Sequence, residues 1–193
     1  MIRVAVEADV PAILAVYAPY ILTTTYTFEY DVPCLRSFTQ RFLTVTEQFP
    51  WLVWEEQGKI LGYAYGSAPY ERAAYQWSGE LSIYLAPDAQ RRGIGKKLYT
   101  AAEKILWLQG YRMIYAIITE ENKGSLAFHQ RLGYQTRAVF PGCGLKFDRW
   151  LGVVWMEKAA DSVEIPSNPP APWYSIVQNN RKLYDILATL SLS

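Results

Sequence analysis

Hydrophobic positions change their spacing near the middle of the chain. From residue 80 to 86, leucine or isoleucine at every second position alternates with serine or tyrosine, which is typical of a β-strand with one buried face. From residue 94 to 108, apolar residues recur every three or four positions up to Gly110, which predicts a helix that packs against a sheet. A strand, a short loop and a helix are therefore expected in direct succession.

The rest of the chain up to residue 158 shows the same mixture of patterns. Strands are expected over 2–6, 113–119, 134–140 and 149–156, helices over 9–20, 36–49 and 122–132, and a hairpin over 51–67. Hairpin-linked strands interspersed with helices predict an α/β domain with a mixed, mostly antiparallel sheet.

The chain changes character after residue 158. We expect residues 1–158 to form one domain, 159–173 a proline-rich linker and 174–193 a helical extension. The favoured interpretation of the extension is a packing helix without a catalytic role.

Composition narrows the possible partners. A net charge of +1 over 193 residues does not indicate a nucleic-acid partner, which would need an excess of clustered basic residues. The two cysteines, Cys34 and Cys143, make no disulfide framework. The N-terminus does not read as a signal peptide, and no membrane-spanning stretch is seen. A cytoplasmic protein with a small-molecule partner is expected.

The loop before the central helix, "DAQRRGIGKKL" (88–98), combines glycines with basic residues. Its spacing fits neither the dinucleotide fingerprint nor the nucleoside-triphosphate loop, but it does match Gln/Arg-x-x-Gly-x-Gly/Ala at Gln90, Gly93 and Gly95. Glycines allow close approach of an anion to the free N–H groups and the positive end of the helix dipole. Taken alone, the pattern also fits an ordinary strand-to-helix turn on a basic surface.

Four blocks carry a resemblance to a known family. They are "TTTYTFE", "RAAYQWSGELSIYLAPDAQRRGIGKKL", "NKGSLAFHQRLGY" and "GCGLKFDRWLGVVWMEK". In order and spacing, the chain resembles the GNAT superfamily of N-acetyltransferases, closest to its phosphinothricin and methionine-sulfoximine branch, over most of residues 1–158. The resemblance implies a GNAT-type sheet flanked by helices, acetyl-CoA as cosubstrate, no metal and a homodimer.

The resemblance also implies which residues hold acetyl-CoA. The pantetheine would pair with the strand at Ile83, Tyr84 and Leu85, and Asn122 and Ser125 would contact its end. The pyrophosphate would rest on the loop residues Arg91, Arg92, Gly93, Ile94, Gly95 and Lys96, and Gln90, at the start of the motif, would also bind the cofactor. Asn122 has an alternative interpretation as a helix N-cap.

Acetyl transfer to an amine needs a group that removes a proton from the ammonium, and a departing thiolate has to be protonated. Glu80 stands where the branch places its catalytic carboxylate, although a solvated strand-end glutamate remains an alternative. His129 lies where many superfamily members place the tyrosine that protonates the thiolate, and a structural histidine is an equal alternative. No catalytic role transfers to the "KFDRW" block.

The acceptor site is expected on the loops before the cofactor strand. Arg72 and Tyr75 would hold a carboxylate, and Phe28 and Glu29 would shape the pocket, with a packed surface loop as the alternative. The implied reaction is acetylation of the α-amine of a small amino acid or an amino-acid-like toxin. A peptide or N-terminal acetyltransferase and a non-catalytic acyl-CoA sensor remain as other classes.

Overall fold

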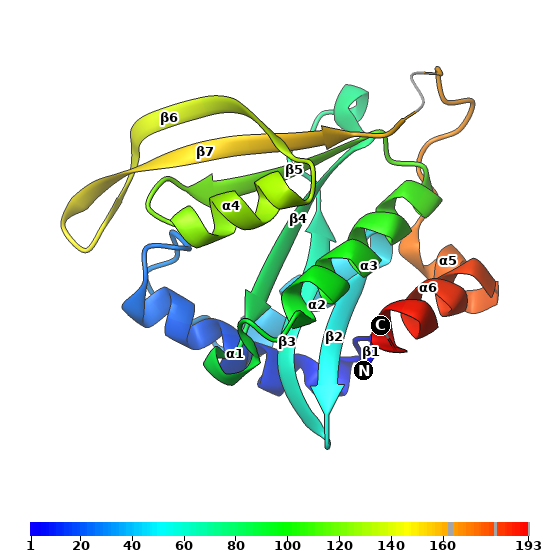
Figure 1. Cartoon of the computed structure of the whole chain (residues 1–193), viewed down its shortest axis with the longest axis horizontal. Coiled ribbons are helices and arrows are strands. Elements are labelled where there is room, and N and C mark those ends of the chain that lie inside the picture. The colour runs from blue at the N-terminus through cyan, green and yellow to red at the C-terminus, as the bar shows by residue number, and fades with distance from the viewer. Residues whose placement is uncertain (162–163, 180, 193) are drawn as a thin grey trace.

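A seven-stranded sheet forms the centre of the described part of the chain (Figure 1). The computed structural model describes residues 1–161, 164–179 and 181–192. The strands are β1 (Ile2–Val4), β2 (Trp51–Glu56), β3 (Lys59–Ser67), β4 (Ser78–Leu85), β5 (Met113–Thr119), β6 (Gln135–Lys146) and β7 (Arg149–Ala159). Their order is β1-β2-β3-β4-β5-β7-β6, and every neighbouring pair is antiparallel except β4 and β5. The expected mixed, mostly antiparallel α/β fold is confirmed.

Helices cover both faces of the sheet. They are α1 (Val10–Thr23), α2 (Leu35–Gln48), α3 (Ile94–Gln109), α4 (Lys123–Arg131), α5 (Trp173–Asn179) and α6 (Arg181–Leu192). The apolar face of α3 joins the core on one side of the sheet, whereas α1 and α2 pack on the other around Trp51 and Tyr63. None of these helices, in the described ranges, is long and apolar enough to cross a membrane.

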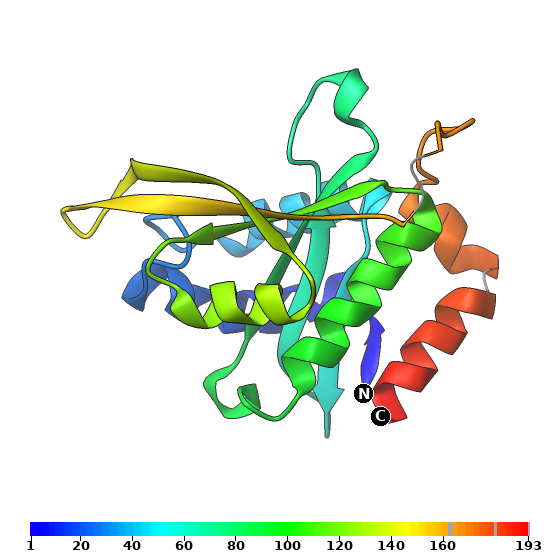
Figure 2. The ribbon, with the colours of Figure 1, turned by 45° about the horizontal axis from the view of Figure 1, so that its top comes forward.

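The β6–β7 hairpin is longer than the sequence predicted. A strand was expected over 134–140, but β6 continues to Lys146, and its register against β7 shifts between Phe140 and Gly144. Pro141 and two glycines argue against a regular strand here, and a bulge with Gly142 at φ 60° accommodates them. The hairpin therefore projects well beyond the rest of the sheet (Figure 2).

The residues after the sheet pack against the domain. Trp173, Ile176 and Leu183 are buried in the same core as α3, and the Ile2 amide donates to Ser191 Oγ over 2.9 Å. The described residues of the expected helix 174–193 form two helices, α5 and α6, and α5 already begins at Trp173. Residues 162–163 of the expected linker, and 180 and 193 of the expected helix, lie outside the described residues.

The side chain of Gln109 ties this extension to the sheet domain. Its Nε2 donates to the backbone carbonyl oxygens of Gln48 and Ala171, each over 2.8 Å. The backbone amide of Ala171 in turn donates to the backbone carbonyl oxygen of Gln109. Gln109 is buried, so these bonds satisfy donors that water cannot reach. The extension is thus held on the far side of α3 from the hairpin.

Candidate active site

The site is built on a fork between β4 and β5. Only Ser78–Glu80 of β4 pair with Met113–Tyr115 of β5, after which the two strands diverge (Figure 1). β4 stays paired with β3 as far as Leu85, and β5 stays paired with β7 as far as Thr119. The sheet therefore opens into a gap with a free backbone edge on β4.

The free edge of β4 faces into this gap. The hydroxyl of Tyr20, near the end of α1, donates to the Leu85 carbonyl over 2.6 Å and accepts from the Leu85 amide over 3.3 Å. Because strand N–H and C=O groups point alternately to the two sides, the backbone groups of Ile83 and Leu81 face the same gap. A ligand lying between the strands would find both a donor and an acceptor on the backbone of Ile83, which lies beyond the last residue that pairs with β5.

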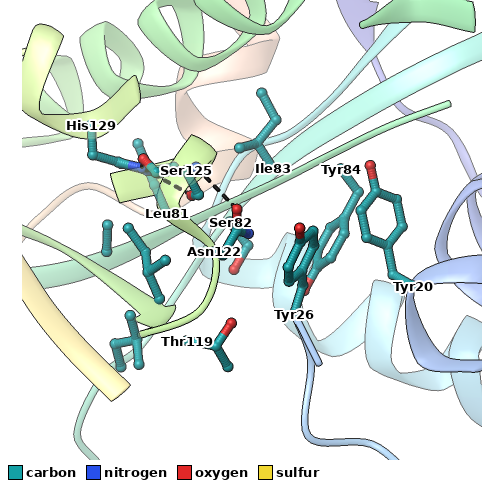
Figure 3. A pocket seen from close by; sticks show the side chains of 13 residues that line it. Tyr20, Tyr26, Leu81, Ser82, Ile83, Tyr84, Thr119, Asn122, Ser125 and His129 are labelled. Carbon is teal, nitrogen blue, oxygen red and sulfur yellow. Dashed lines mark hydrogen bonds between the residues drawn. The ribbon is translucent and has the colours of Figure 1, made fainter. Parts of the chain in front are cut away.

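Two connected hollows occupy the gap. The smaller has a volume of about 70 Å³ and is lined by residues 81–84 of β4, 116–119 of β5, and by Tyr20, Tyr26, Asn122, Ser125 and His129. Figure 3 shows His129 and Ser125 together on one side of it and Tyr20, Tyr26 and Tyr84 grouped on the other. The larger, of about 610 Å³, shares five of these residues and runs to the N-terminus of α3.

The larger groove ends on the glycine-rich loop. Gly93 has φ 80° and caps α3, whose first internal hydrogen bond runs from the Lys97 amide to the Gly93 carbonyl. The amides of Ile94, Gly95 and Lys96 are therefore free of helix partners. Arg91 and Lys96 also line the groove. Free amides, the helix dipole and two cations suit a polyphosphate.

Glycine at position 95 allows the helix to approach β4 closely. A Cβ there would lie 3.1 Å from Leu85 Cδ1, tighter than ordinary contacts. The expected residues Ile83, Leu85, Gln90, Arg91, Gly93, Gly95, Lys96, Asn122 and Ser125 all line the larger groove. The side chain of Ile94 is buried in the core, so only its backbone is available.

Arg92 lies outside the groove lining. Its guanidinium donates twice to Glu56, over 3.0 and 2.7 Å, and Asp88 accepts from Lys59 over 2.9 Å. These two pairs attach the loop to the β2–β3 hairpin. Arg92 thus anchors the loop, although the sequence placed it among the ligand-binding residues.

Asn122, Ser125 and His129 lie at the start and along one side of α4. The Asn122 carbonyl oxygen Oδ1 accepts from the Ser125 amide over 3.0 Å, so it caps the helix while lining both hollows. His129 is buried, and its Nδ1 lies 2.8 Å from the Ser125 carbonyl oxygen. Burial lowers the pKa of His129 to about 4, so the ring is neutral at pH 7.

The neutral His129 ring has one proton to place. A carbonyl oxygen can only accept, so the proton lies on Nδ1, and Nε2, which has no described partner, carries a lone pair. Such a nitrogen accepts a hydrogen bond and has no proton to give to a thiolate. The geometry favours the structural alternative for His129.

Glu80 stands at the apex of the fork. It is the last β4 residue that pairs with β5, and it immediately precedes Leu81, the first lining residue of the smaller hollow, without lining that hollow itself. Burial raises the pKa of Glu80 to about 7, and no described cation counteracts the shift. A carboxyl group with this pKa exchanges protons readily near neutral pH, as a general base must.

The expected acceptor residues lie in two separate places. Phe28 packs its ring where a Cβ on Gly144 would have to lie, and Glu29 forms a 2.6 Å ion pair with Arg41. Tyr75 belongs to the β3–β4 loop and contacts Tyr70, with ring centroids 4.4 Å apart. Arg72 precedes it on the same loop, and none of the four predicted acceptor residues lines the two hollows.

Several lining residues were missed by sequence reasoning. They are Tyr20, Tyr26, Thr119, Gly124, Phe128, Arg131 and Leu132. Tyr26 and Phe128 belong to "TTTYTFE" and "NKGSLAFHQRLGY", two of the blocks that carry the family resemblance. The resemblance therefore pointed to these segments but did not show that these two side chains line the site. Nothing in the sequence around Tyr20 indicates its role, because that role depends on a hydrogen bond to Leu85, the last residue of β4.

A groove between diverging strands that ends on free helix amides can hold an extended ligand with a polyphosphate, and the comparisons with known proteins identify the class of enzyme. Residues 2–155 match the model of the "Acetyltransferase (GNAT) domain". The chain belongs to this family and is an acetyl-CoA-dependent N-acetyltransferase.

Named relatives and a solved structure are similar over nearly their whole length. Phosphinothricin N-acetyltransferase of Streptomyces viridochromogenes is 31% identical over 92% of this chain and 94% of the relative. The L-methionine sulfoximine/L-methionine sulfone acetyltransferase of Pseudomonas aeruginosa is 34% identical, over 83% and 94%. A crystal structure of the Sinorhizobium meliloti phosphinothricin acetyltransferase in complex with AcCoA superposes with a TM-score of 0.84 at 32% identity, over 90% and 96%.

Proposed function

We propose that the protein transfers the acetyl group of acetyl-CoA to the α-amine of a small amino acid or an amino-acid-like toxin of the phosphinothricin or methionine-sulfoximine type. The observation that carries the proposal is the placement of Glu80, a carboxyl with a pKa of about 7, at the apex of the fork. The named relatives support the acceptor class.

In this proposal the groove residues hold acetyl-CoA. The free amides at the N-terminus of α3, with Arg91 and Lys96, bind the pyrophosphate, and the backbone of Ile83 pairs with the pantetheine. The Leu85 backbone is already bound by Tyr20, so Tyr20 sets where that pairing ends. Asn122 and Ser125 lie against the pantetheine near the thioester.

Glu80 then supplies the base. It takes a proton from the acceptor ammonium through a water molecule, and the neutral nitrogen bonds to the acetyl carbonyl carbon. The carbon–sulfur bond breaks, and coenzyme A leaves as a thiolate that takes up the proton released by the new amide nitrogen. The α-amine of a peptide has a pKa of roughly 8, and that of a free amino acid is higher because of its own carboxylate, so a base of pKa about 7 assists deprotonation at neutral pH.

A screen of amines tests this function. Purified protein with acetyl-CoA is expected to release free thiol with methionine sulfoximine, phosphinothricin or a natural amino acid. Peptides with a free N-terminus form the second arm. Turnover of peptides alone would support the peptide acetyltransferase, and tight binding without turnover of any amine would support the sensor.

We also propose that the protein is a twofold homodimer formed through the β6–β7 hairpin. The apolar residues exposed on this hairpin are Val139, Phe140, Leu145, Phe147 and Trp150, the last with 70% of its surface accessible. The C-terminal helices pack against α3 and β1, so they leave this surface open. Apolar patches of this kind commonly mark interfaces.

Light scattering at micromolar concentration is expected to give twice the chain mass. Trp150→Lys should give a monomer, because it places a charge in the proposed interface. Tyr184→Lys is the matched control, since Tyr184 is 61% exposed on α6 and should leave the dimer intact. A monomeric wild-type protein would contradict the proposal.

A further inference from the structure

The β6–β7 hairpin is fastened to the segment 24–30 that connects α1 and α2. Lys146 Nζ donates to the Thr27 carbonyl oxygen over 2.7 Å, and the Tyr30 hydroxyl donates to the Leu145 carbonyl oxygen over 2.6 Å. The close packing of Phe28 on Gly144 adds an apolar contact. The hairpin and segment 24–30, more than 100 residues apart in sequence, thus lie side by side (Figure 2).

A lysine is an unusual residue for a buried contact between two segments. Only 2% of its surface is accessible, and burial lowers the pKa of its ammonium while the charge of Glu29 opposes that shift. Its one hydrogen-bond partner among the described residues is the Thr27 carbonyl oxygen. A buried cation is costly, so a hydrophobic residue would stabilise the fold more simply at this position.

The fastened segment forms one wall of the site. Tyr26 lines both hollows, and Thr27 Oγ1 lies 2.7 Å from the Tyr17 hydroxyl, which also donates to Glu29. A shift of the Thr27 backbone would therefore move Tyr26, which precedes it in the chain, and would disturb the hydrogen bond between Thr27 and Tyr17.

The same hairpin reaches this segment a second time. Arg149, the first residue of β7, forms an ion pair with Glu121, and Glu121 accepts a hydrogen bond from Thr25 Oγ1 over 3.2 Å. These side chains are exposed, so this link is weaker than that of Lys146.

We propose that Lys146 is a positioning residue, which holds segment 24–30 as the wall of the acceptor site and thereby sets the affinity for the acceptor amine. It acts through the Thr27 carbonyl and contacts neither substrate. The proposal rests on the function proposed above and gives the "KFDRW" block a role there.

The test compares Lys146→Met with wild type in two measurements. Methionine keeps much of the length and loses the donor. Hydrogen exchange is expected to become faster at the amides of 24–30. The KM for the acceptor should rise about tenfold, as expected when a hydrogen bond from a charged group is lost. Tyr26 also lines the acetyl-CoA groove, but the α3 loop is not touched, so the Kd for acetyl-CoA, measured by calorimetry, should change much less than the acceptor KM.

Two further variants control for a general loss of structure. Arg137→Met removes the Arg137–Glu157 ion pair, which stays inside the hairpin, and should change neither measurement. Lys146→Arg restores a charged donor and should recover part of the acceptor affinity. If Lys146→Met does not fold, Tyr30→Phe removes the neighbouring bond from an exposed side chain and should act in the same direction.

The outcomes separate this proposal from the function on which it rests. An unchanged acceptor KM, an equal weakening of acetyl-CoA binding, or unchanged exchange over 24–30 would each overturn the positioning role. A wild-type protein that acetylates none of the amines overturns the proposed function, and hydrogen exchange then decides by itself whether Lys146 holds the segment.

Discussion

Glu80→Gln is expected to slow acetylation of an amino-acid acceptor by about 10²–10⁴-fold at neutral pH while acetyl-CoA binding is retained. Glutamine keeps the size and hydrogen-bonding capacity of the carboxyl group at the apex of the fork and loses its basicity. Initial rates at saturating acetyl-CoA, with calorimetry of the acetyl-CoA complex, measure the two effects separately. A variant as fast as wild type would remove Glu80 from the mechanism.

The pH dependence identifies what Glu80 does. Because its pKa is about 7, the wild-type rate should fall as the pH drops through 7 and the base becomes protonated. Above the pKa of the acceptor's own ammonium, which for a free amino acid is higher than the value of roughly 8 of a peptide N-terminus, the amine arrives neutral, so the rates of variant and wild type should converge. A deficit that is the same at every pH would show that Glu80 positions the acceptor and does not accept its proton.

Stability gives an independent check on the same variant. A folded-state pKa raised from 4.5 to about 7 means that the ionised carboxylate destabilises the fold, so wild-type stability falls as the pH rises through this window. Glutamine has no charge to bury. The melting temperature of Glu80→Gln at pH 8 should therefore equal or exceed that of wild type, and a large decrease would indicate a disturbed fold.

Gly93→Glu is expected to reduce acetyl-CoA binding by about a hundredfold or more, because it places a negative charge beside the free amides of α3 and near the proposed pyrophosphate position. A Cβ at Gly93 would meet nothing within 4 Å, so the side chain has room in the folded protein. Its φ of 80° adds backbone strain, which circular dichroism and thermal unfolding would report. Calorimetry of the folded variant measures the loss.

Gly58→Glu is the matched control for this variant. Gly58 lies in the β2–β3 turn, has φ 76° and likewise has open space where its Cβ would be, so the strain and the added charge are equivalent. It does not line the groove, and its acetyl-CoA affinity should match wild type. Equal affinity of folded Gly93→Glu and wild type would mean that the loop does not bind the pyrophosphate.

The sequence predicted the parts of the fold that depend on local pattern. The order of helices and strands and the loop after β4 follow from residue spacing, because side chains within one element share its period. The extent of β6 did not follow, since Pro141 and the nearby glycines indicate a loop and only pairing with β7 keeps them in a strand. Tertiary pairing there overrides local propensity.

The site shows the same division. The groove residues on β4 and at the N-terminal end of α3 follow one another in the chain, so the sequence could place them, whereas most of those on α4 could not be placed in this way. Whether the Arg92 guanidinium points to a ligand or to Glu56 depends on the β2–β3 hairpin, which no local pattern connects to the loop. Tyr20 and the contacts of Lys146 depend on partners 65 and 119 residues away. The acceptor residues Phe28, Glu29, Arg72 and Tyr75 remain predictions, and all four lie outside the two hollows.

The fork also divides the domain mechanically. Strands β1–β4 join β5, β7 and β6 along the sheet through only three residue pairs, and the core around α3 is shared by both parts. Such a seam is where local opening begins, and opening exposes chain to proteases. A ligand seated between β4 and β5 bridges both parts, and ligand binding stabilises the closed form by mass action. Proteolysis of the purified protein should therefore become slower when its thioester substrate is present.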